Sequence, residues 1–302
     1  MKSWLRLLRV SLAPTAAADA AAGVVYACGG FPADARAWWL VPASLGVYHG
    51  ALALNDWNDR EHDARSRPSR PIPSGSISPA LALATAIALF VAGLVCAWLA
   101  APSSALWMGG VAALAVLYDV AGRGAWRGPL LIGLCRAGNL GSGIWWAIQA
   151  GALTMPAASA FLPAFAYGLY VFTVARLGRL EDGEDERPLG ERPRVLLTIA
   201  AALLASIAVT PTSAPILVRA AAVALAIAGA AGLLAAARPG RTWSRGDVER
   251  AMGIALRRLL VASAVVALLA VRPGSWDGAL VAAAILLGFP LAHGLRRVFP
   301  PS

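Results

Sequence analysis

The chain has 302 residues, 59% of them hydrophobic and 14% charged, with a formal net charge of +10 at pH 7. Charged residues make up about a quarter of an ordinary soluble domain, so this composition excludes that class. The positive charge is almost entirely arginine and flanks apolar runs, which favours a membrane-topology signal over nucleic-acid binding. Three scattered cysteines without a CxxC pair indicate neither a disulfide framework nor a zinc site.

Ten apolar runs follow one another along the chain, most of them close to the roughly 20 residues that cross a bilayer as a helix. The first run, about 12–28, holds Pro14 and Asp19, which would interrupt the apolar heart of a cleaved signal peptide. We therefore expect a first membrane helix with its N-terminus inside. The other runs lie at about 38–56, 79–100, 105–119, 129–149, 157–176, 195–210, 214–237, 252–271 and 276–294.

Residues 1–302 are thus predicted to form a single all-α domain, a polytopic membrane bundle of nine or ten transmembrane helices. The count is nine if the last two runs are one span plus an interfacial helix, to which the basic loop 238–250 and its neighbouring arginines would contribute. With ten spans and an inside N-terminus, the inside loops hold most of the basic residues, as the positive-inside rule requires. This topology places the charged loops 55–78 and 177–194 on the cytoplasmic side of what we expect to be a bacterial plasma membrane.

The most informative stretch begins where the second run ends. Asn55, Asp59 and Asp63 are spaced four residues apart, with Asp56 beside them, so on a helix their oxygen atoms share one face. Stacked like charges repel, and a divalent cation such as Mg²⁺, which prefers hard oxygen ligands, would remove that penalty. The helix should end in the following segment of alternating arginines and prolines. Carboxylates, a metal and arginines at a membrane surface suggest a bound pyrophosphate.

Other charges have two interpretations each. The segment 177–194 carries six of the 16 acidic residues and is either a solvated loop or part of the same site. Asp19 and Arg136 lie inside predicted spans, where charge is costly unless it meets a polar cavity or a partner. They either contribute to a substrate pocket or form a buried structural pair. Asp119, at the end of the fourth run, is expected to balance Arg123.

The motif Asn55-Asp56-x-x-Asp59-x-x-x-Asp63, followed by the Arg-Pro-rich segment from Arg67 to Ser78, resembles the first signature of the UbiA superfamily of intramembrane prenyltransferases. The resemblance runs over about residues 5–195. It implies a second acidic motif at 181–190, where the family's aspartate spacing is kept with a glutamate at one position. Tyr118-Asp119 and the stretch from Cys135 to Gly141 are most similar to the EboC-like branch.

The resemblance implies a Mg²⁺-dependent integral-membrane prenyltransferase that moves an isoprenyl group from an allylic prenyl diphosphate to an unidentified acceptor and releases diphosphate. The implied catalytic residues are Asn55, Asp56, Asp59 and Asp63. The implied metal ligands are these four with Glu181, Asp182 and Asp185. The implied substrate-binding residues are Arg70, Tyr118, Arg123, Arg136 and Asn139. Membrane lipid is the expected surrounding, and nucleic acid is not an expected partner.

Three other functions remain open at this stage. A transporter would use the intramembrane charges Asp19 and Arg136, although the acidic clusters sit at one face rather than at the midplane. A CDP-alcohol phosphotransferase would also use helical aspartates, but its Asp-Gly-x-x-Ala-Arg run is absent from the sequence. A non-catalytic isoprenoid-binding relative is compatible with the irregular second motif.

Overall fold

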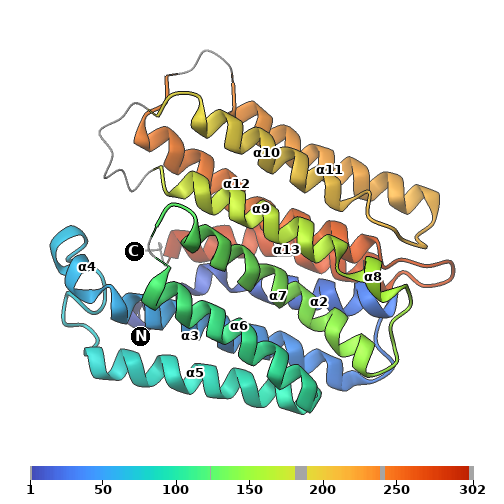
Figure 1. The fold of residues 1–302 in the computed structure, drawn as a ribbon, viewed down its shortest axis with the longest axis horizontal. Helices are drawn as coiled ribbons and strands as arrows, with labels where there is room; N and C mark the ends of the chain where they lie inside the picture. The colour runs from blue at the N-terminus through green and yellow to red at the C-terminus, as the bar shows by residue number, and fades with distance from the viewer. Residues whose placement is uncertain (1, 123, 181–188, 239–241, 299–302) are drawn as a thin grey trace.

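A computed structural model describes residues 2–122, 124–180, 189–238 and 242–298, with side chains described up to residue 295. Within these ranges the secondary-structure elements are all helices and no β-strand is present, which confirms the all-α prediction. The helices of 16 or more residues lie side by side in Figure 1. They are α2 (Ala13–Cys28), α3 (Leu40–Asn58), α5 (Pro79–Ala100), α6 (Pro102–Ala121), α7 (Arg127–Gln149), α9 (Leu162–Gly178), α10 (Arg192–Ile207), α11 (Ile216–Ala236), α12 (Arg245–Leu268) and α13 (Asp277–Val298).

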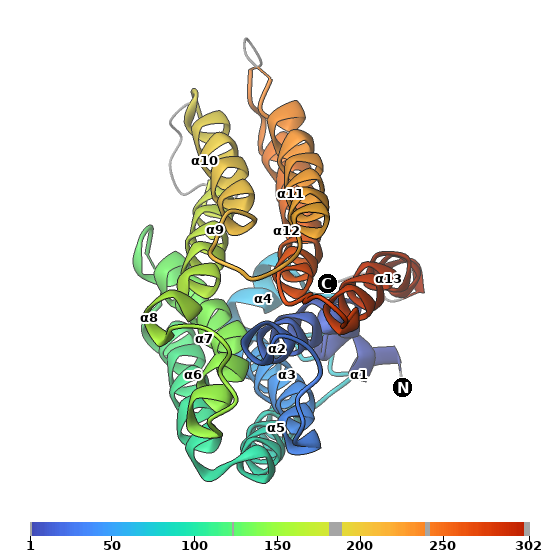
Figure 2. The ribbon, with the colours of Figure 1, turned by 90° about the vertical axis from the view of Figure 1, so that its right-hand side faces the viewer.

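The helix α2 lies at the centre of the bundle and packs against α3, α7, α12 and α13 (Figure 2). From α3 to α13, each long helix packs against the next long helix along the chain. This includes α7 and α9, although the short α8 (Ala157–Ala160) lies between them in sequence. A second set of contacts, α3 with α6 and α9 with α12, closes the bundle across its middle. As a result, the two halves of the chain meet around α2.

Within the described ranges, seven helices are long and apolar enough to cross a membrane: α5, α6, α11, α12, α13 up to Leu295, and two that extend α2 and α9 to Val10–Cys28 and Ala157–Gly178. The helices α3, α7 and α10 fall outside this set, although they run alongside the others (Figure 1). Polar residues lower the mean hydropathy of two of these helices: Asn55 and Asp56 in α3, and Arg136 and Asn139 in α7. The count of nine or ten spans therefore stays a prediction.

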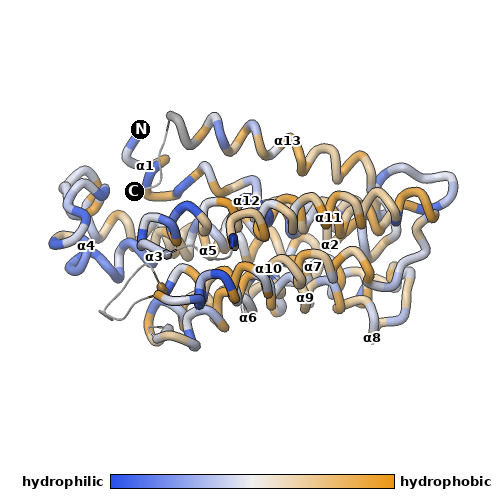
Figure 3. The backbone as a smooth tube through the Cα atoms, turned by 90° about the horizontal axis from the view of Figure 1, so that it is seen from above, coloured by the Kyte–Doolittle hydropathy of each residue, from blue (hydrophilic) through white to orange (hydrophobic). Residues whose placement is uncertain are grey.

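The two ends of the bundle differ in polarity. The hydrophilic end in Figure 3 carries α4 (Arg60–Ser66), the N-terminal α1 (Lys2–Leu7) and the last described turn of α13. The ends of α3, α6, α9 and α11 lie at this same end, as do the beginnings of α5, α7, α10 and α12 (Figure 1). We call it the α4 end. The opposite end carries the 3-10 helix η2 (Ala35–Trp39) and the turns after α5, α7 and α10.

The predicted runs and the helices differ most in the last third of the chain. The expected basic loop 238–250 ends early, because α12 begins at Arg245 and continues without a break to Leu268. Its start is fixed by a capping box, in which Ser244 and Asp247 exchange side-chain and backbone hydrogen bonds. Both α12 and α13 are long and apolar enough to be candidate spans. The connection between the runs expected at 79–100 and 105–119 is also shorter, since α6 already begins at Pro102.

Glycines allow the central helices to approach one another closely. A Cβ on Gly143 of α7 would lie 2.2 Å from the backbone nitrogen of Val24 in α2. A Cβ on Gly46 of α3 would lie 2.7 Å from the Cα of Gly93 in α5. Small residues at such crossings let backbones touch, which is a main source of helix association where lipid removes the hydrophobic driving force. The α2–α7 crossing matters for function because both helices contribute side chains to the interior described below.

We predict that Gly143→Ala destabilises the protein, because the new methyl group meets backbone rather than a movable side chain. The expected loss is about 1–3 kcal/mol, the usual cost of overpacking. Thermal unfolding of the purified protein in detergent measures it. Gly109→Ala in α6 is the matched control, since nothing lies within 4 Å of its added Cβ. Equal melting temperatures for the two variants would show that this crossing is not tightly packed.

Candidate active site

A cavity of about 520 Å³ lies inside the α4 half of the bundle, bounded by the 3-10 helix η1 (Val10–Leu12) and by α3, α6, α7, α9 and α12. That volume is typical of small-molecule sites. Much of its wall is apolar: Val47, Val111, Ala115, Ile132, Val171, Val174, Leu256 and Leu259. Its polar lining falls into two groups. The outer group, nearest the α4 end, is Arg9, Asn55, Tyr118, Asp119 and Arg179, and the inner group is Ser44, Tyr48, Arg136 and Asn139.

In the outer group, one amide bridges two carboxylates. The Nδ2 atom of Asn55 donates to Oδ1 of Asp119 at 3.0 Å and to Oδ2 of Asp59 at 3.4 Å. Asn58 donates to the backbone carbonyl of Asp119 at 2.9 Å, which fixes the end of α6 against the end of α3. These contacts bring together a motif residue, Asp59, and an acidic residue 60 positions later in the chain.

The other two acids of the motif are paired with arginines. Arg9 contacts Oδ1 of Asp56 at 2.6 Å. Arg70 contacts Oδ2 of Asp63 at 2.5 Å and Oδ1 of Asp56 at 3.6 Å. Asp56, Asp63 and Arg70 are all buried, and charges buried in this way require partners. This group holds the loop after α4 against the end of α3.

The single row of oxygens expected for Asn55, Asp59 and Asp63 is therefore divided. The helix α3 ends at Asn58, Asp59 lies between the two helices, and α4 begins at Arg60. Asp63 turns to Arg70, while Asp59 stays with Asn55. A bound cation is one source of relief from the repulsion between these like charges. Here Arg9 and Arg70 supply part of that relief. Arg9 is distant from the motif in sequence and Arg70 lies beyond the end of α4, so helical spacing does not predict either contact.

Two further side chains complete the outer group. A Cβ on Gly128, in the first turn of α7, would lie 2.6 Å from Nη2 of Arg179 and 3.3 Å from Cε2 of Tyr118. The arginine that follows α9 and the tyrosine near the end of α6 thus meet over the start of α7. Arg179 is the residue from which the chain continues towards the second acidic segment. A guanidinium and a phenol beside carboxylates can bind an anion that a metal ion, held by the carboxylates, binds as well.

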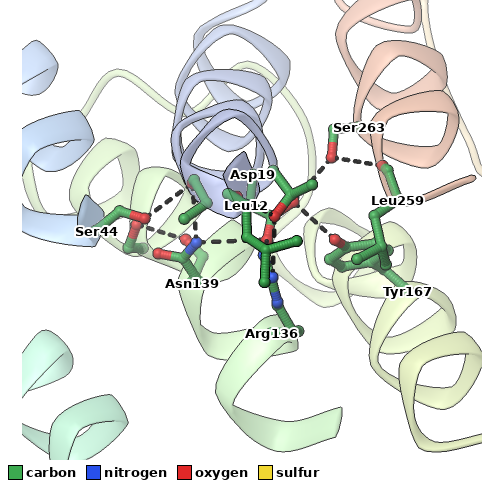
Figure 4. A network of polar contacts seen from close by, with 11 residues as sticks. Leu12, Asp19, Ser44, Arg136, Asn139, Tyr167, Leu259 and Ser263 are labelled. Carbon is green, nitrogen blue, oxygen red and sulfur yellow. Dashed lines mark hydrogen bonds and ion pairs between the residues drawn. The ribbon is translucent and has the colours of Figure 1, made fainter. Parts of the chain in front are cut away.

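The inner group surrounds a buried ion pair (Figure 4). The guanidinium of Arg136 donates to Oδ2 of Asp19 at 2.8 Å and to the hydroxyl of Thr15 at 3.0 Å. The other oxygen of Asp19 accepts hydrogen bonds from Tyr167 at 2.7 Å and from Ser263 at 2.8 Å. The network joins α2, α7, α9 and α12, so both halves of the chain depend on it. Of the two interpretations of Asp19 and Arg136, a pocket or a buried pair, this arrangement shows the pair, while Arg136 also lines the cavity.

Arg136 also faces the cavity. Its guanidinium carbon lies 4.7 Å from the centre of the Tyr48 ring, a cation–π contact. Asn139 follows one helical turn later and donates to the carbonyl of Ala16 at 3.1 Å and to Asp19 at 3.4 Å. Because Asp19 balances the charge of Arg136, the inner end of the cavity is polar but carries no excess charge.

The positions predicted from sequence are distributed as follows. Asn55, Tyr118, Arg136 and Asn139 line the cavity, Asp59 contacts Asn55, and Asp56, Asp63 and Arg70 form the buried group beside it. Arg123, Glu181, Asp182 and Asp185 lie outside the described residues. Sequence reasoning did not assign a site role to five residues that line the cavity: Arg9, Ser44, Tyr48, Asp119 and Arg179. Only the charge of Asp119 within an apolar run could have signalled one of them.

The described oxygens fit a divalent cation of the Mg²⁺ type in part. No group of three or more His, Cys, Asp or Glu side chains converges anywhere in the described ranges. Asp59 and Asp119 do approach the same amide, and Oδ2 of Asp119 is buried with no hydrogen-bond partner among the described residues. Protein sites for Mg²⁺ commonly use one or two carboxylates and complete the shell with water and substrate phosphates. Two carboxylates satisfy that requirement. Asn55 would add its Oδ1 only with its amide turned over, because its NH₂ group now faces both carboxylates.

The fold and the cavity define the class of this protein: a helical membrane protein with an acidic and basic cluster at one end of a largely apolar cavity. The sequence model of the UbiA prenyltransferase family matches residues 12–257. The chain therefore belongs to the UbiA prenyltransferase family, and with seven apolar helices it is an integral membrane protein.

Known proteins of this family resemble the chain in sequence and in fold. The chain is 57% identical over 51 residues to digeranylgeranylglyceryl phosphate synthase of Methanothrix thermoacetophila, covering 17% of this chain and 19% of that protein. It is 32% identical over 183 residues to the bacteriochlorophyll synthase 33 kDa chain of Rhodobacter capsulatus, covering 55% and 58%. These alignments span less than two thirds of the relatives' own lengths.

Two solved structures have the same fold. A structure concerning digeranylgeranylglyceryl phosphate synthase in membranes superposes with a TM-score of 0.61 and 20% identity, covering 89% of this chain and 98% of that one. A UbiA homologue from Archaeoglobus fulgidus, bound to GPP and Mg²⁺, gives a TM-score of 0.60 and 18% identity, covering 87% and 99%. These likenesses confirm the UbiA-like fold. Placement in the EboC-like branch stays a prediction.

We predict that Asp19→Leu and Arg136→Met each destabilise the protein strongly, because each leaves its partner as an uncompensated buried charge. The expected cost is about 3–5 kcal/mol for either change. The double variant should be more stable than either single one, since it leaves no charge in the interior. Thermal unfolding of the four proteins in detergent forms a double-mutant cycle. Strictly additive losses would mean that the pair is not the main partner of either charge.

Proposed function

We propose that this protein is an integral-membrane prenyltransferase, which moves an isoprenyl group from an allylic prenyl diphosphate to an acceptor and releases diphosphate. One observation carries the proposal: acids and arginines gather at the outer end of a cavity of about 520 Å³ whose wall is largely apolar. An allylic diphosphate has the same division, a multiply charged head and an apolar tail. Family membership supports the reaction class, and the A. fulgidus homologue holds GPP and Mg²⁺.

We propose Mg²⁺ as the metal and Asn55 and Asp59 as residues that hold it, with Asp56 and Asp63 positioned beside them by Arg9 and Arg70. Bound Mg²⁺ would neutralise the diphosphate and stabilise it as a leaving group. Tyr118 and Arg179 line the same cavity and would contact the diphosphate oxygens. Such electrostatic stabilisation is often the largest contribution to catalysis. We also propose roles for Glu181, Asp182, Asp185 and Arg123, from their places in the sequence motifs.

The apolar wall has a separate task. When the allylic C–O bond breaks, the reacting carbon becomes electron-poor and would be captured by any water nearby. The valines, leucines and alanines around the cavity exclude water and bind the isoprenyl tail. At the inner end, Arg136 and Asn139 supply polar groups whose net charge is balanced by Asp19. We propose that they orient a substrate rather than neutralise the diphosphate.

We further propose that the α4 end faces the cytoplasm of a bacterial plasma membrane. The loops at this end follow α3, α6, α9 and α11 and contain most of the arginines, whereas the opposite loops contain Arg36 and Arg272. This asymmetry follows the positive-inside rule. The cavity is lined by helices from α3 to α12, which supports the proposal that residues 1–302 act as one domain.

The proposal predicts that Asp59→Ala abolishes Mg²⁺-dependent diphosphate release. The change removes a carboxylate that shares the Asn55 amide with Asp119, and so weakens the binding of metal and leaving group. Purified protein is incubated with Mg²⁺, DMAPP, GPP and longer prenyl diphosphates, together with membrane lipid extract as the source of acceptor. Release of diphosphate and consumption of each prenyl chain are followed by mass spectrometry.

Asp34→Ala is the matched control. Asp34 lies at the opposite end of the bundle, before η2, where hydrogen bonds from Arg36 lower the pKa of its carboxyl and keep it charged. This variant should retain the wild-type rate. Full diphosphate release by Asp59→Ala would argue against the metal role of the motif. Binding of prenyl diphosphates without turnover in the wild-type protein would favour the non-catalytic isoprenoid-binding alternative.

A further inference from the structure

We infer that Asp119, which lies outside the acidic motifs, is a third residue of the divalent-metal site, together with Asn55 and Asp59. The inference deepens the proposed function and depends on it, because the metal is the one that would bind the diphosphate. It replaces the simpler expectation that Asp119 merely balances Arg123. The site would then be built from the ends of two different helices, α3 and α6, which meet at the outer end of the cavity.

Geometry places Asp119 beside the motif. Its Oδ1 accepts a hydrogen bond from Nδ2 of Asn55 at 3.0 Å, and the same nitrogen lies 3.4 Å from Oδ2 of Asp59. An amide between two carboxylates turns its NH₂ group towards both, since oxygen facing oxygen would repel. The place between Asp59 and Asp119 therefore already holds the positive end of a dipole.

Burial makes the carboxylate of Asp119 unusual. The residue is 5% exposed and lines the cavity, yet its Oδ2 has no hydrogen-bond partner among the described residues. A buried carboxylate oxygen without a partner is costly unless an ion or a bound group completes its environment. The backbone of Asp119 is also held at this place, because Asn58 donates a hydrogen bond to its carbonyl oxygen at 2.9 Å.

The distribution of arginines points to Asp119. Arg9 and Arg70 take Asp56 and Asp63, and these pairs are buried and close. Asp119 has no ion pair within the described part of the chain, and the neutral Asn55 is its described side-chain contact. The described side chains thus leave the charge of Asp119 without a cationic partner. A divalent cation shared with Asp59 would neutralise it.

The test measures metal binding directly. Mn²⁺ replaces Mg²⁺ as the probe, and electron paramagnetic resonance follows the loss of the free-ion signal on binding to the purified full chain in detergent, with and without inorganic pyrophosphate. Asp119→Asn keeps the size of the side chain and an oxygen for Asn55, but removes the charge. We expect its dissociation constant for Mn²⁺ to rise at least about tenfold, as expected when a charged ligand is lost.

Asp34→Asn, the control at the opposite end, should bind Mn²⁺ like the wild type. Melting temperatures without metal establish that the variants are folded, and Mn²⁺ should raise the melting temperature of the wild type and of Asp34→Asn more than that of Asp119→Asn. Should Asp119→Asn not fold, Asp119→Ser gives the same comparison with a smaller side chain, and Asp119→Glu should restore part of the affinity. Unchanged Mn²⁺ affinity in a folded variant without the carboxylate overturns the inference.

The result also separates this inference from the proposed function. If Asp119→Asn binds Mn²⁺ normally while the wild type still releases diphosphate, the function stands and Asp119 is not a ligand. If the wild type binds no Mn²⁺ with or without pyrophosphate, the inference fails, and diphosphate release then decides the function independently. Weakened Mn²⁺ binding in Asp119→Asn supports the inference even in a preparation that lacks the acceptor.

Discussion

The buried carboxylate of Asp19 is the interaction on which the rest of the structure depends. It receives hydrogen bonds from Arg136, Tyr167 and Ser263, which lie on three different helices, and its own helix α2 is the centre of the bundle. An unpartnered charge at this depth would cost several kcal/mol, so the four helices must come together for any of them to be stable there. By joining α7 to α9 and α12, the network also fixes the walls of the cavity.

Arginine has two uses in this molecule. At the α4 end, Arg9 and Arg70 hold Asp56 and Asp63 in buried pairs, which shape the loop that follows the motif. Arg179 lines the cavity where a diphosphate would lie. Deeper inside, Arg136 is neutralised by Asp19 and covered by Tyr48, so it offers polarity without net charge. The cavity is therefore charged at its outer end and neutral at its inner end, which orders a charged head and an apolar tail in one direction.

Much of the fold could be predicted because the bilayer constrains helices by length and polarity alone. The runs expected at 79–100 and 129–149 agree closely with α5 and α7, since their ends are marked by prolines, turns or arginines. The run expected at 252–271 begins too late, because α12 already begins at Arg245. The capping box and four arginines around this start are polar, and hydropathy alone assigns such residues to a loop. The number of spans is harder to predict, because α3 and α7 are not apolar enough to be recognised as spans by hydropathy. Their polar side chains have partners on other helices instead.

The sequence by itself determined the family, the all-helical membrane fold and the acidic motif from Asn55 to Asp63, because these depend on local spacing and composition. It could not show that Asp56 and Asp63 turn to Arg9 and Arg70, nor that Asp119 joins Asn55 and Asp59. Only the tertiary structure decided those partners. Helical periodicity says which residues share a face of one helix, whereas hydrogen-bond partners 47 or 64 positions apart are chosen by how whole helices pack.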